Sequence, residues 1–334
     1  MSIALELAGL LADPSRGVHT PDWTGLIAAA RAESLIGSLA CRLEGRELPE
    51  AVERMMEDAR RDAEHVRVRA LWEAEMARRA LDPLGIPVVL LKGTAYAAAG
   101  LSASAGRSIG DLDILVPRES LDAVQAALLA AGWEWVKEDA YDDLYYRTWM
   151  HELPPLIHRE RDRMIDVHHT ILPLTARRKP DAGAMIAASV RLESGLRVLA
   201  PADMVIHSAA HLFADGDLAG GLRNLWDIDR LLREFSAADA EFWGKLEARA
   251  ARHDLSSAVH RAARLASNLY ETPIPETWRA WDNADPLFRA RLLARNGWGQ
   301  ATRPALRLAF YVRSHWMRMP PLMLARHLWT KARR

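Results

Sequence analysis

The sequence predicts an α+β protein in which a small β-rich section lies between two helical regions. Three observations support this fold class. Apolar residues first recur at helical period, short apolar runs bounded by turn residues then fill residues 87–171, and helical period returns from Pro201. We therefore expect an N-terminal helical region over residues 1–84, a core over 85–175, and a C-terminal helical domain with a basic tail over 176–334.

The N-terminal region is expected to be helical throughout. Residues 22–46 carry apolar and polar groups at helical period. Residues 48–82 predict one long helix or a close pair of helices, because their apolar side chains recur at helical spacing while Arg and Glu fill the other face. Pro83 and Gly85 are expected to end this region, since proline disrupts a helix and glycine readily adopts the conformation that closes one.

The core section is expected to alternate strands with short helices. An apolar run over residues 87–92 predicts a buried strand, and a small-residue helical segment follows at residues 95–99. The remaining expected elements are a strand at 111–116, a helix at 119–131, a strand at 133–136, and a hairpin formed by 155–160 and 163–171. Residues 139–151 are aromatic and acidic, fit no element, and are expected to form a loop.

Helix returns in the C-terminal part of the chain. Residues 202–213 are strongly periodic and place His207 and His211 four residues apart on one face. That spacing occurs in zinc helices, but the glutamate of the H-E-x-x-H motif is missing, so we do not expect zinc there. Beyond Asp285 no acidic residue occurs, while basic residues recur among apolar ones. Such a tail either docks on the protein, which we favour, or makes peripheral contact with an anionic membrane or an acidic partner.

The composition narrows the class of protein. Half of the 334 residues are hydrophobic and the formal net charge is zero, so neither disorder nor general polyanion binding is indicated. Nucleic acid is not an expected partner, because no RNA-recognition signature accompanies the basic tail. The single cysteine, Cys41, excludes a disulfide framework. The sequence has neither a signal-peptide pattern nor a long apolar run, so a cytoplasmic protein is expected.

Two aspartates one residue apart stand inside an apolar, strand-like run. On an extended strand Asp111 and Asp113 would leave the same face, because side chains alternate along it. Two like charges side by side are costly unless a positive charge lies between them. The run therefore predicts a divalent-metal site, whereas an isolated Asp-x-Asp is more often a solvated loop or a helix cap. Asp166, which lies in another apolar run, is a third candidate acid.

A second candidate feature follows the first predicted strand. That strand breaks at Lys92-Gly93-Thr94, where a helical segment starts. A cation and free backbone N–H groups at such a junction are suited to binding an anion. The segment is not a P-loop, because the G-x-x-x-x-G-K-[ST] spacing is absent.

These residues together resemble the uncharacterised nucleotidyltransferase family, which belongs to the DNA polymerase β-like nucleotidyltransferase superfamily. The resemblance covers about residues 85–235 and rests on Leu91-Lys92-Gly93, Arg107, the run 110–116 and Ile165-Asp166-Val167-His168. It implies a small mixed sheet carrying three carboxylates, which bind one or two Mg²⁺ ions. The expected co-substrate is a nucleoside triphosphate, with ATP preferred, oriented for in-line attack at its α-phosphorus.

The resemblance implies a role for each matching residue. Asp111 and Asp113 match the metal-binding pair. Asp166 matches the third acid, which holds the catalytic metal and helps to deprotonate the acceptor. Gly93 and Thr94 stand where the superfamily has a Gly-Ser turn that contacts the triphosphate, although the interval from this turn to the first aspartate is longer here.

Other residues are expected at the edge of this site. Lys92 and Arg107 are candidate triphosphate contacts, and pairing of Arg107 with Asp111 is the alternative. The C-terminal helices are expected to pack across the cleft. Three polar or charged side chains of these helices are candidate contacts to nucleotide or acceptor, namely His211, Arg223 and Asp227. The alternative is that they form a polar network between helices.

The predicted activity is Mg²⁺-dependent transfer of a nucleoside monophosphate to an unknown acceptor, with release of pyrophosphate. The acceptor is a small molecule, a peptide or a protein, because acceptor pockets follow no motif that the sequence would reveal. Two alternatives stay open: a nucleotide-sensing or regulatory module without turnover, and a membrane- or peptide-associated biosynthetic partner that works through its basic tail.

Overall fold

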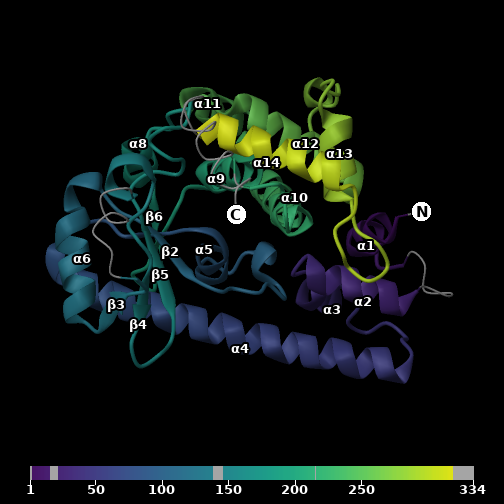
Figure 1. Ribbon diagram of the computed structural model, residues 1–334, viewed down its shortest axis with the longest axis horizontal. Coiled ribbons are helices and arrows are strands. Elements are labelled where there is room, and N and C mark those ends of the chain that lie inside the picture. The colour runs from purple at the N-terminus through teal and green to yellow at the C-terminus, as the bar shows by residue number, and fades with distance from the viewer. Residues whose placement is uncertain (1, 16–21, 138–145, 215, 319–334) are drawn as a thin grey trace, which may run out of the picture.

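A mixed seven-stranded sheet lies among helices in the computed structural model, which describes residues 2–15, 22–137, 146–214 and 216–318 (Figure 1). The predicted α+β class and the mixed sheet are confirmed. None of the helices within these ranges is both long enough and apolar enough to cross a membrane. The three-part division of the chain stays a prediction, and one continuous apolar core contains side chains from all three parts.

The sheet combines two parallel pairs with antiparallel neighbours. Its order is β3-β4-β5-β2-β1-β7-β6. The strands are β1 (Val89–Leu90), β2 (Leu112–Leu115), β3 (Trp133–Trp135), β4 (Leu156–His158), β5 (Met164–His168), β6 (Val190–Arg191) and β7 (Arg197–Val198). The first five fall inside the predicted strands, whereas β6 and β7 were not predicted. Two residues are too few to show the alternation on which a strand prediction depends.

The parallel pairing of β2 with β5 positions the acidic residues. Its register places Asp113 beside Asp166 and Ile114 beside Val167. Because side chains on paired positions of neighbouring strands point the same way, the two aspartates share one face of the sheet. All four residues of β2 are buried, so the strand lies in the interior of the sheet.

The N-terminal helices are α1 (Ile3–Ala12), α2 (Trp23–Ala32), α3 (Ile36–Arg42) and α4 (Glu50–Leu81). The sequence left open one long helix or two, and α4 is a single helix of 32 residues. It extends from α3 to the sheet along one side of the molecule (Figure 1). The 3₁₀ turn η1 (Asp82–Leu84) and Gly85, whose φ is +64°, end it where the sequence predicts.

Short helices and 3₁₀ turns lie between the strands of the sheet region. Among them are α5 (Lys92–Ala98), η2 (Ser102–Ser104), η3 (Arg118–Ser120), α6 (Leu121–Ala130) and α8 (Ala182–Ala187). The helix that follows β1 begins three residues earlier than expected, at Lys92 instead of Ala95. Consequently the whole Lys-Gly-Thr segment belongs to its first turn.

The C-terminal helices cover one end of the sheet and contact the N-terminal ones. They are α9 (Pro201–Ala214), α10 (Gly221–Ala238), α11 (Phe242–Arg252), α12 (Ser256–Tyr270), η4 (Glu276–Trp278), α13 (Asp285–Leu292) and α14 (Pro304–Arg318). Helix α9 packs on α10, α11 and α12, and α1 packs on α12. The two ends of the chain therefore belong to one packed assembly.

The described part of the basic tail docks on the protein. Phe310 of α14 is buried, with its ring centroid 4.9 Å from that of Phe288. Arg313 donates a hydrogen bond to the carbonyl oxygen of Phe213, over 2.9 Å. The docking interpretation therefore holds for α14. The rest of the tail, residues 319–334, lies outside the described residues.

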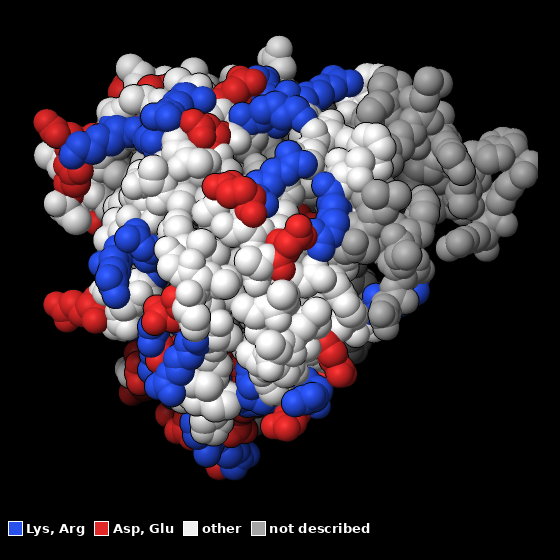
Figure 2. All heavy atoms as spheres, turned by 90° about the vertical axis from the view of Figure 1, so that its left-hand side faces the viewer, with Lys and Arg blue, Asp and Glu red and all other residues white. Residues whose placement is uncertain are grey.

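Charged side chains of both signs are interspersed on the molecular face drawn in Figure 2. This face belongs to the sheet end of the molecule, at the left of Figure 1. Among the residues that the structure describes there, Lys and Arg do not gather into a continuous basic surface. Binding along a nucleic-acid backbone uses such a surface.

Candidate active site

Three carboxylates meet on one face of the sheet. Asp111 directly precedes β2, Asp113 lies within it, and Asp166 lies on β5. Each offers one carboxylate oxygen, and these oxygens lie within 4.8 Å of one another. The alternation along β2 brings the first two together, and the parallel register adds the third. The structure thus groups the three acids that the sequence proposed as metal ligands.

Asp113 is the most enclosed of the three, with 2 % of its surface exposed. Its Oδ1 accepts a hydrogen bond from Lys92 Nζ at 2.7 Å and lies 3.0 Å from His168 Nε2. Burial alone would raise the pKa of Asp113, but the ammonium of Lys92 and the contact with His168 outweigh it and hold the pKa below its ordinary range. Asp113 is therefore an anion at neutral pH.

Asp166 has the opposite electrostatic environment. Burial, followed by the charges of Asp113 and Glu152, raises the pKa of Asp166 to about 7. The protein thus leaves this carboxylate among like charges. Three carboxylates that share one small volume favour a hard divalent cation, and oxygen donors of this kind suit Mg²⁺. The residues present therefore fit the metal ion that the resemblance implies.

A cavity of about 310 Å³ opens beside the carboxylates. Its wall combines one lysine with acidic, histidine and apolar side chains. The lining residues are Lys92, Asp111, Met150, His151, Glu152, Asp166, His168, Ile171, Leu172, Pro173, His211 and Ala214. The segment over residues 139–151, which was expected to form a loop, is helical at residues 146–149 and contributes Met150 and His151 to this wall. Its residues 139–145 lie outside the described residues. The cavity gives a small substrate direct access to two of the three acids.

The backbone at the end of β1 directs Lys92 toward the carboxylates. Lys92 has a φ of +48°, in the left-handed region that costs a residue with a β-carbon of order 1 kcal/mol. Its neighbour Leu91 donates a backbone hydrogen bond to the carbonyl oxygen of Asp113, over 3.0 Å. This bond holds the junction against β2, and the ammonium of Lys92 reaches Asp113 and the cavity.

Gly93 and Thr94, the other predicted triphosphate contacts, do not line this cavity. A β-carbon built at Gly93 would lie 1.9 Å from Nη1 of Arg107, so the guanidinium occupies the space beside the glycine. Thr94 is buried, with 1 % of its surface exposed. The need for glycine at position 93 is therefore explained by the packing of Arg107.

Arg107 is engaged in a buried ionic network. Its Nε donates a hydrogen bond to Asp227 at 2.9 Å, and Arg223 Nη2 lies 3.1 Å from the other oxygen of Asp227. Arg223 also donates a hydrogen bond to Ser38 Oγ, over 2.6 Å. The network links the core to α10 and α3. Arg107 thus does not pair with Asp111 and does not line the cavity. Arg223 and Asp227 belong to the polar network between helices that was the alternative interpretation for them.

Helix α9 brings His211 to the cavity wall and leaves His207 in the interior. Their ring centroids lie 6.5 Å apart. Burial, followed by the nearby charge of Lys92, holds the pKa of His207 well below its ordinary value, so this imidazole is neutral. Of the three candidate contacts from the C-terminal helices, His211 is the one that faces the cavity.

Sequence reasoning missed His151 and Glu152 as residues of the site. Both line the cavity, and Glu152 forms an isolated antiparallel bridge with His168 of β5. The bridge extends the hairpin past the predicted start of its first strand. The available signal was the adjacent His and Glu just before that strand, in a segment that matched no element.

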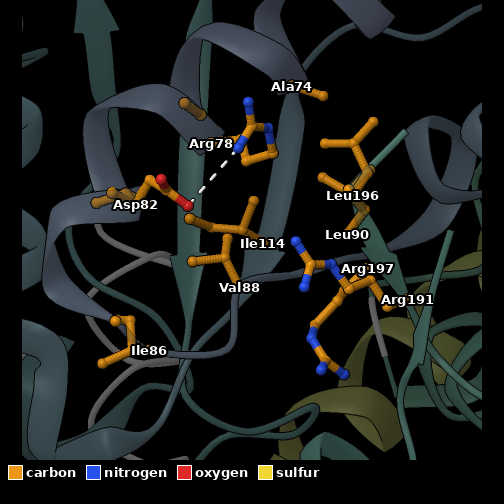
Figure 3. Close-up of a pocket in the computed structure, with 14 residues that line it drawn as sticks. Ala74, Arg78, Asp82, Ile86, Val88, Leu90, Ile114, Arg191, Leu196 and Arg197 are labelled. Carbon is orange, nitrogen blue, oxygen red and sulfur yellow. Dashed lines mark ion pairs between the residues drawn. The ribbon is translucent and has the colours of Figure 1, made fainter. Parts of the chain in front are cut away.

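A second cavity, of about 230 Å³, lies apart from the acids. It is lined by Leu90 of β1, Ile114 of β2, the end of α4 and three arginines (Figure 3). Arg78, one of these arginines, lies 3.6 Å from Asp82. None of the three clustered aspartates lines this cavity. The cavity beside the acids is therefore the candidate active site.

Comparison with known proteins agrees with this geometry. None of the curated proteins compared with the chain matches it significantly. The pattern that defines the uncharacterised nucleotidyltransferase family matches residues 19–271, well beyond the section that carries the resemblance in the sequence. Since this match covers more than half of the chain and includes every acid of the site, the protein belongs to the family of uncharacterised nucleotidyltransferases.

Proposed function

We propose that the protein transfers a nucleoside monophosphate from a nucleoside triphosphate, with ATP expected, to a hydroxyl or similar group of an acceptor. In this reaction an acceptor oxygen forms a bond to the α-phosphorus. The bond from the α-phosphorus to the bridging oxygen breaks, and pyrophosphate leaves. The observation that carries the proposal is the meeting of Asp111, Asp113 and Asp166 on two parallel strands at the cavity, in a chain of this family.

The three aspartates would hold Mg²⁺. Bound there, the ion supplies charge neutralisation for the triphosphate and polarises the α-phosphorus. His168 Nε2 lies 3.0 Å from Asp113 Oδ1 and would keep this carboxylate oriented when Lys92 turns from it to the substrate. Asp166 is placed to take the proton of the acceptor, because its carboxylate lies on the cavity wall beside the other two acids.

Among the predicted triphosphate contacts, the arrangement favours Lys92. Its ammonium lines the cavity beside Asp111. Arg107 would need to leave Asp227 to reach a phosphate, and Gly93 and Thr94 do not line the cavity. We therefore propose that these three residues support the site without contacting the triphosphate. His211 is proposed as a contact to nucleotide or acceptor, while Arg223 and Asp227 position Arg107.

One observation favours a second candidate function, the binding of nucleotide without turnover. The ammonium of Lys92 already contacts Asp113, one of the three carboxylates of the metal site. A chain that keeps this pair when nucleotide binds would sense nucleotide and not transfer it. The two functions differ in one measurable property, the release of pyrophosphate.

The test is calorimetric titration of Mg²⁺ with a non-hydrolysable ATP analogue into wild type and Asp111→Asn/Asp113→Asn. We expect metal-dependent binding by wild type and its loss in the double variant. Asp58→Asn/Asp62→Asn, which removes two exposed carboxylates of α4, is the matched control and keeps binding. An acceptor screen with labelled ATP, GTP, CTP and UTP, followed by pyrophosphate release, then separates transfer from sensing. A folded wild type that binds no triphosphate would refute both functions.

A further inference from the structure

A cluster of two histidines and one glutamate lies next to the three aspartates. His151 and Glu152 belong to the segment before β4, and His168 belongs to β5. The bridge between Glu152 and His168 sets these two residues opposite each other across an antiparallel pair. Each member of the cluster offers one donor atom, and these atoms lie within 4.8 Å of one another. The cluster therefore has the number and closeness of donors that one metal ion requires.

The separations of its donor atoms suit an ion between them better than direct hydrogen bonds. Glu152 Oε2 lies 3.5 Å from His168 Nδ1 and 3.6 Å from His151 Nε2. Both distances exceed those of good nitrogen–oxygen hydrogen bonds. Donors at ~2.0–2.1 Å from one tetrahedral Zn²⁺ ion lie roughly 3.3–3.5 Å apart. The observed spacing is close to that value.

The other ring nitrogen of His168 prepares this residue as a ligand. His168 Nε2 lies 3.0 Å from Asp113 Oδ1, and because Asp113 is ionised, this nitrogen carries the proton and donates. The lone pair is then on Nδ1, which is buried and has no hydrogen-bond partner among the described residues. His168 is only 3 % exposed, so bulk solvent has little access to this atom. A carboxylate that orients one nitrogen of a histidine while the other binds metal is a recurrent arrangement.

His151 is also placed to bind the same metal ion. Its Nε2 lies 3.6 Å from Glu152 Oε2, and its ring centroid lies 5.1 Å from that of His168. All three members of the cluster line the cavity of about 310 Å³. An ion held by them would therefore keep a coordination position open toward the substrate space.

We propose that His151, Glu152 and His168 form a second metal site, which takes a nitrogen-preferring divalent ion such as Zn²⁺. Its two imidazoles and one carboxylate differ from the three carboxylates of Asp111, Asp113 and Asp166, which suit Mg²⁺. The site goes beyond the proposed transfer reaction and does not rest on it. Its open position would present a polarised water or an acceptor group beside the aspartates.

The experiment is titration of the metal-free full chain with Co²⁺ and with Zn²⁺, each in saturating Mg²⁺. Co²⁺ reports its ligands through ligand-field absorption bands, which are intense in a four-coordinate site that contains nitrogen. We expect one equivalent to bind to wild type with such bands. Glu152→Gln and His151→Gln should each weaken binding by at least about 100-fold, since loss of an outer partner already costs ~10–100-fold.

Two further variants locate the ion. Asp111→Asn/Asp166→Asn removes two of the aspartates but keeps Asp113, which orients His168, so Co²⁺ binding should persist with the same bands. His260→Gln removes another histidine paired with a glutamate, at 2.6 Å from Glu247 on α11, and should leave binding unchanged. Circular dichroism and thermal unfolding confirm that each variant is folded.

The outcomes are distinct from those for the transfer reaction. Absence of Co²⁺ and Zn²⁺ binding by wild type would overturn the inference. Loss of binding in Asp111→Asn/Asp166→Asn, with retention in Glu152→Gln, would place the ion on the aspartates and overturn it equally. Nucleotide binding by wild type decides the proposed function separately.

Discussion

At the scale of single residues, the site depends on how each charge is partnered. Asp113 has a cation and a histidine within hydrogen-bonding distance, whereas Asp166 faces other carboxylates. The same residue type therefore serves as a fixed anion in one position and as an acid poised near neutrality in the other. Lys92 links Asp113 to the cavity, because its side chain lines the cavity and contacts Asp113.

Replacing Lys92 by methionine tests whether its ammonium competes with the metal. In Lys92→Met we expect free Mg²⁺ to bind more tightly, because an oxygen of Asp113 is released. The ATP analogue should bind roughly tenfold more weakly, the usual worth of a charge-assisted hydrogen bond. Calorimetric titration of each ligand alone measures both effects. Weaker binding of Mg²⁺ as well would contradict the competition and assign Lys92 a purely structural role.

Replacing Gly93 by alanine tests the packing of Arg107. The new methyl group would lie 1.9 Å from Arg107 Nη1 and displace this guanidinium from Asp227. We expect the free energy of unfolding to fall by about 1–3 kcal/mol, the usual cost of overpacking. Denaturation by urea measures it.

Gly9→Ala is the control for that substitution. Gly9 lies inside α1, and a β-carbon there would meet nothing within 4 Å. Alanine should therefore keep or slightly raise stability through its better helix propensity. Equal stability of Gly93→Ala and wild type would show that Arg107 moves without cost.

At the scale of elements, two different physical effects place the site. The register of β2 and β5 brings carboxylates together that are far apart in the sequence. Helix α4 then supports the sheet, because it packs on β2, α5 and α6. Its side toward the protein carries buried residues that are small or apolar apart from Glu73, which pairs with Arg161, while its other face carries exposed charged pairs. The long amphipathic pattern was therefore readable from the sequence, whereas the partners of its apolar face were not.

Shortening a buried side chain at the end of α4 tests this support. Leu81 is fully buried at the end of the helix, so Leu81→Ala should lower the free energy of unfolding by about 2–5 kcal/mol through lost contacts and a cavity. Val68→Ala, on the same helix but 52 % exposed, should change stability little. Urea denaturation compares the two variants with wild type. Similar small effects at both positions would show that α4 contributes little to the packed core.

At the scale of the whole molecule, the N- and C-terminal helical regions are joined by a buried ion pair. Arg295 donates a hydrogen bond to Glu33 at 2.7 Å across 262 residues of sequence. Glu33 is 3 % exposed and also accepts a hydrogen bond from the backbone of Leu222, over 3.2 Å. Burial raises the pKa of Glu33 even though Arg295 opposes it. The folded state therefore retains the proton of Glu33 at pH values where the unfolded chain has lost it.

The direction of the pH dependence follows from that shift. Because the folded pKa of Glu33 lies above the unfolded value, this carboxyl costs stability as pH rises through the folded pKa. In Arg295→Met the charge that opposes burial is lost, so the cost at neutral pH increases to about 3–5 kcal/mol, as for other broken buried pairs. The difference from wild type should shrink on acidification, because protonated Glu33 no longer needs a partner.

Urea denaturation at several pH values checks this prediction. Arg54→Met, which breaks an exposed pair with Glu50 on α4, is the control and should show little change at any pH. A destabilisation of Arg295→Met that does not depend on pH would contradict the role of Glu33 and indicate lost packing instead.

Local patterns in the sequence predict the type of most elements, the three clustered acids and the resemblance to the family. These properties follow from local patterns: helical period, an apolar run interrupted at every second position, and the spacing of Lys92, Asp111 and Asp113. Boundaries were less accurate where a helix began at a strained residue, as at Lys92, and strands as short as β6 and β7 carry too few residues to form a pattern.

Which charges face one another became visible in the folded molecule. It placed Arg107 on Asp227, gave His211 but not Arg223 to the cavity wall, and brought Glu152 opposite His168. Such contacts join residues distant in sequence. Their geometry depends on strand register and helix packing, which are set by the fit of the whole core and not by any local pattern.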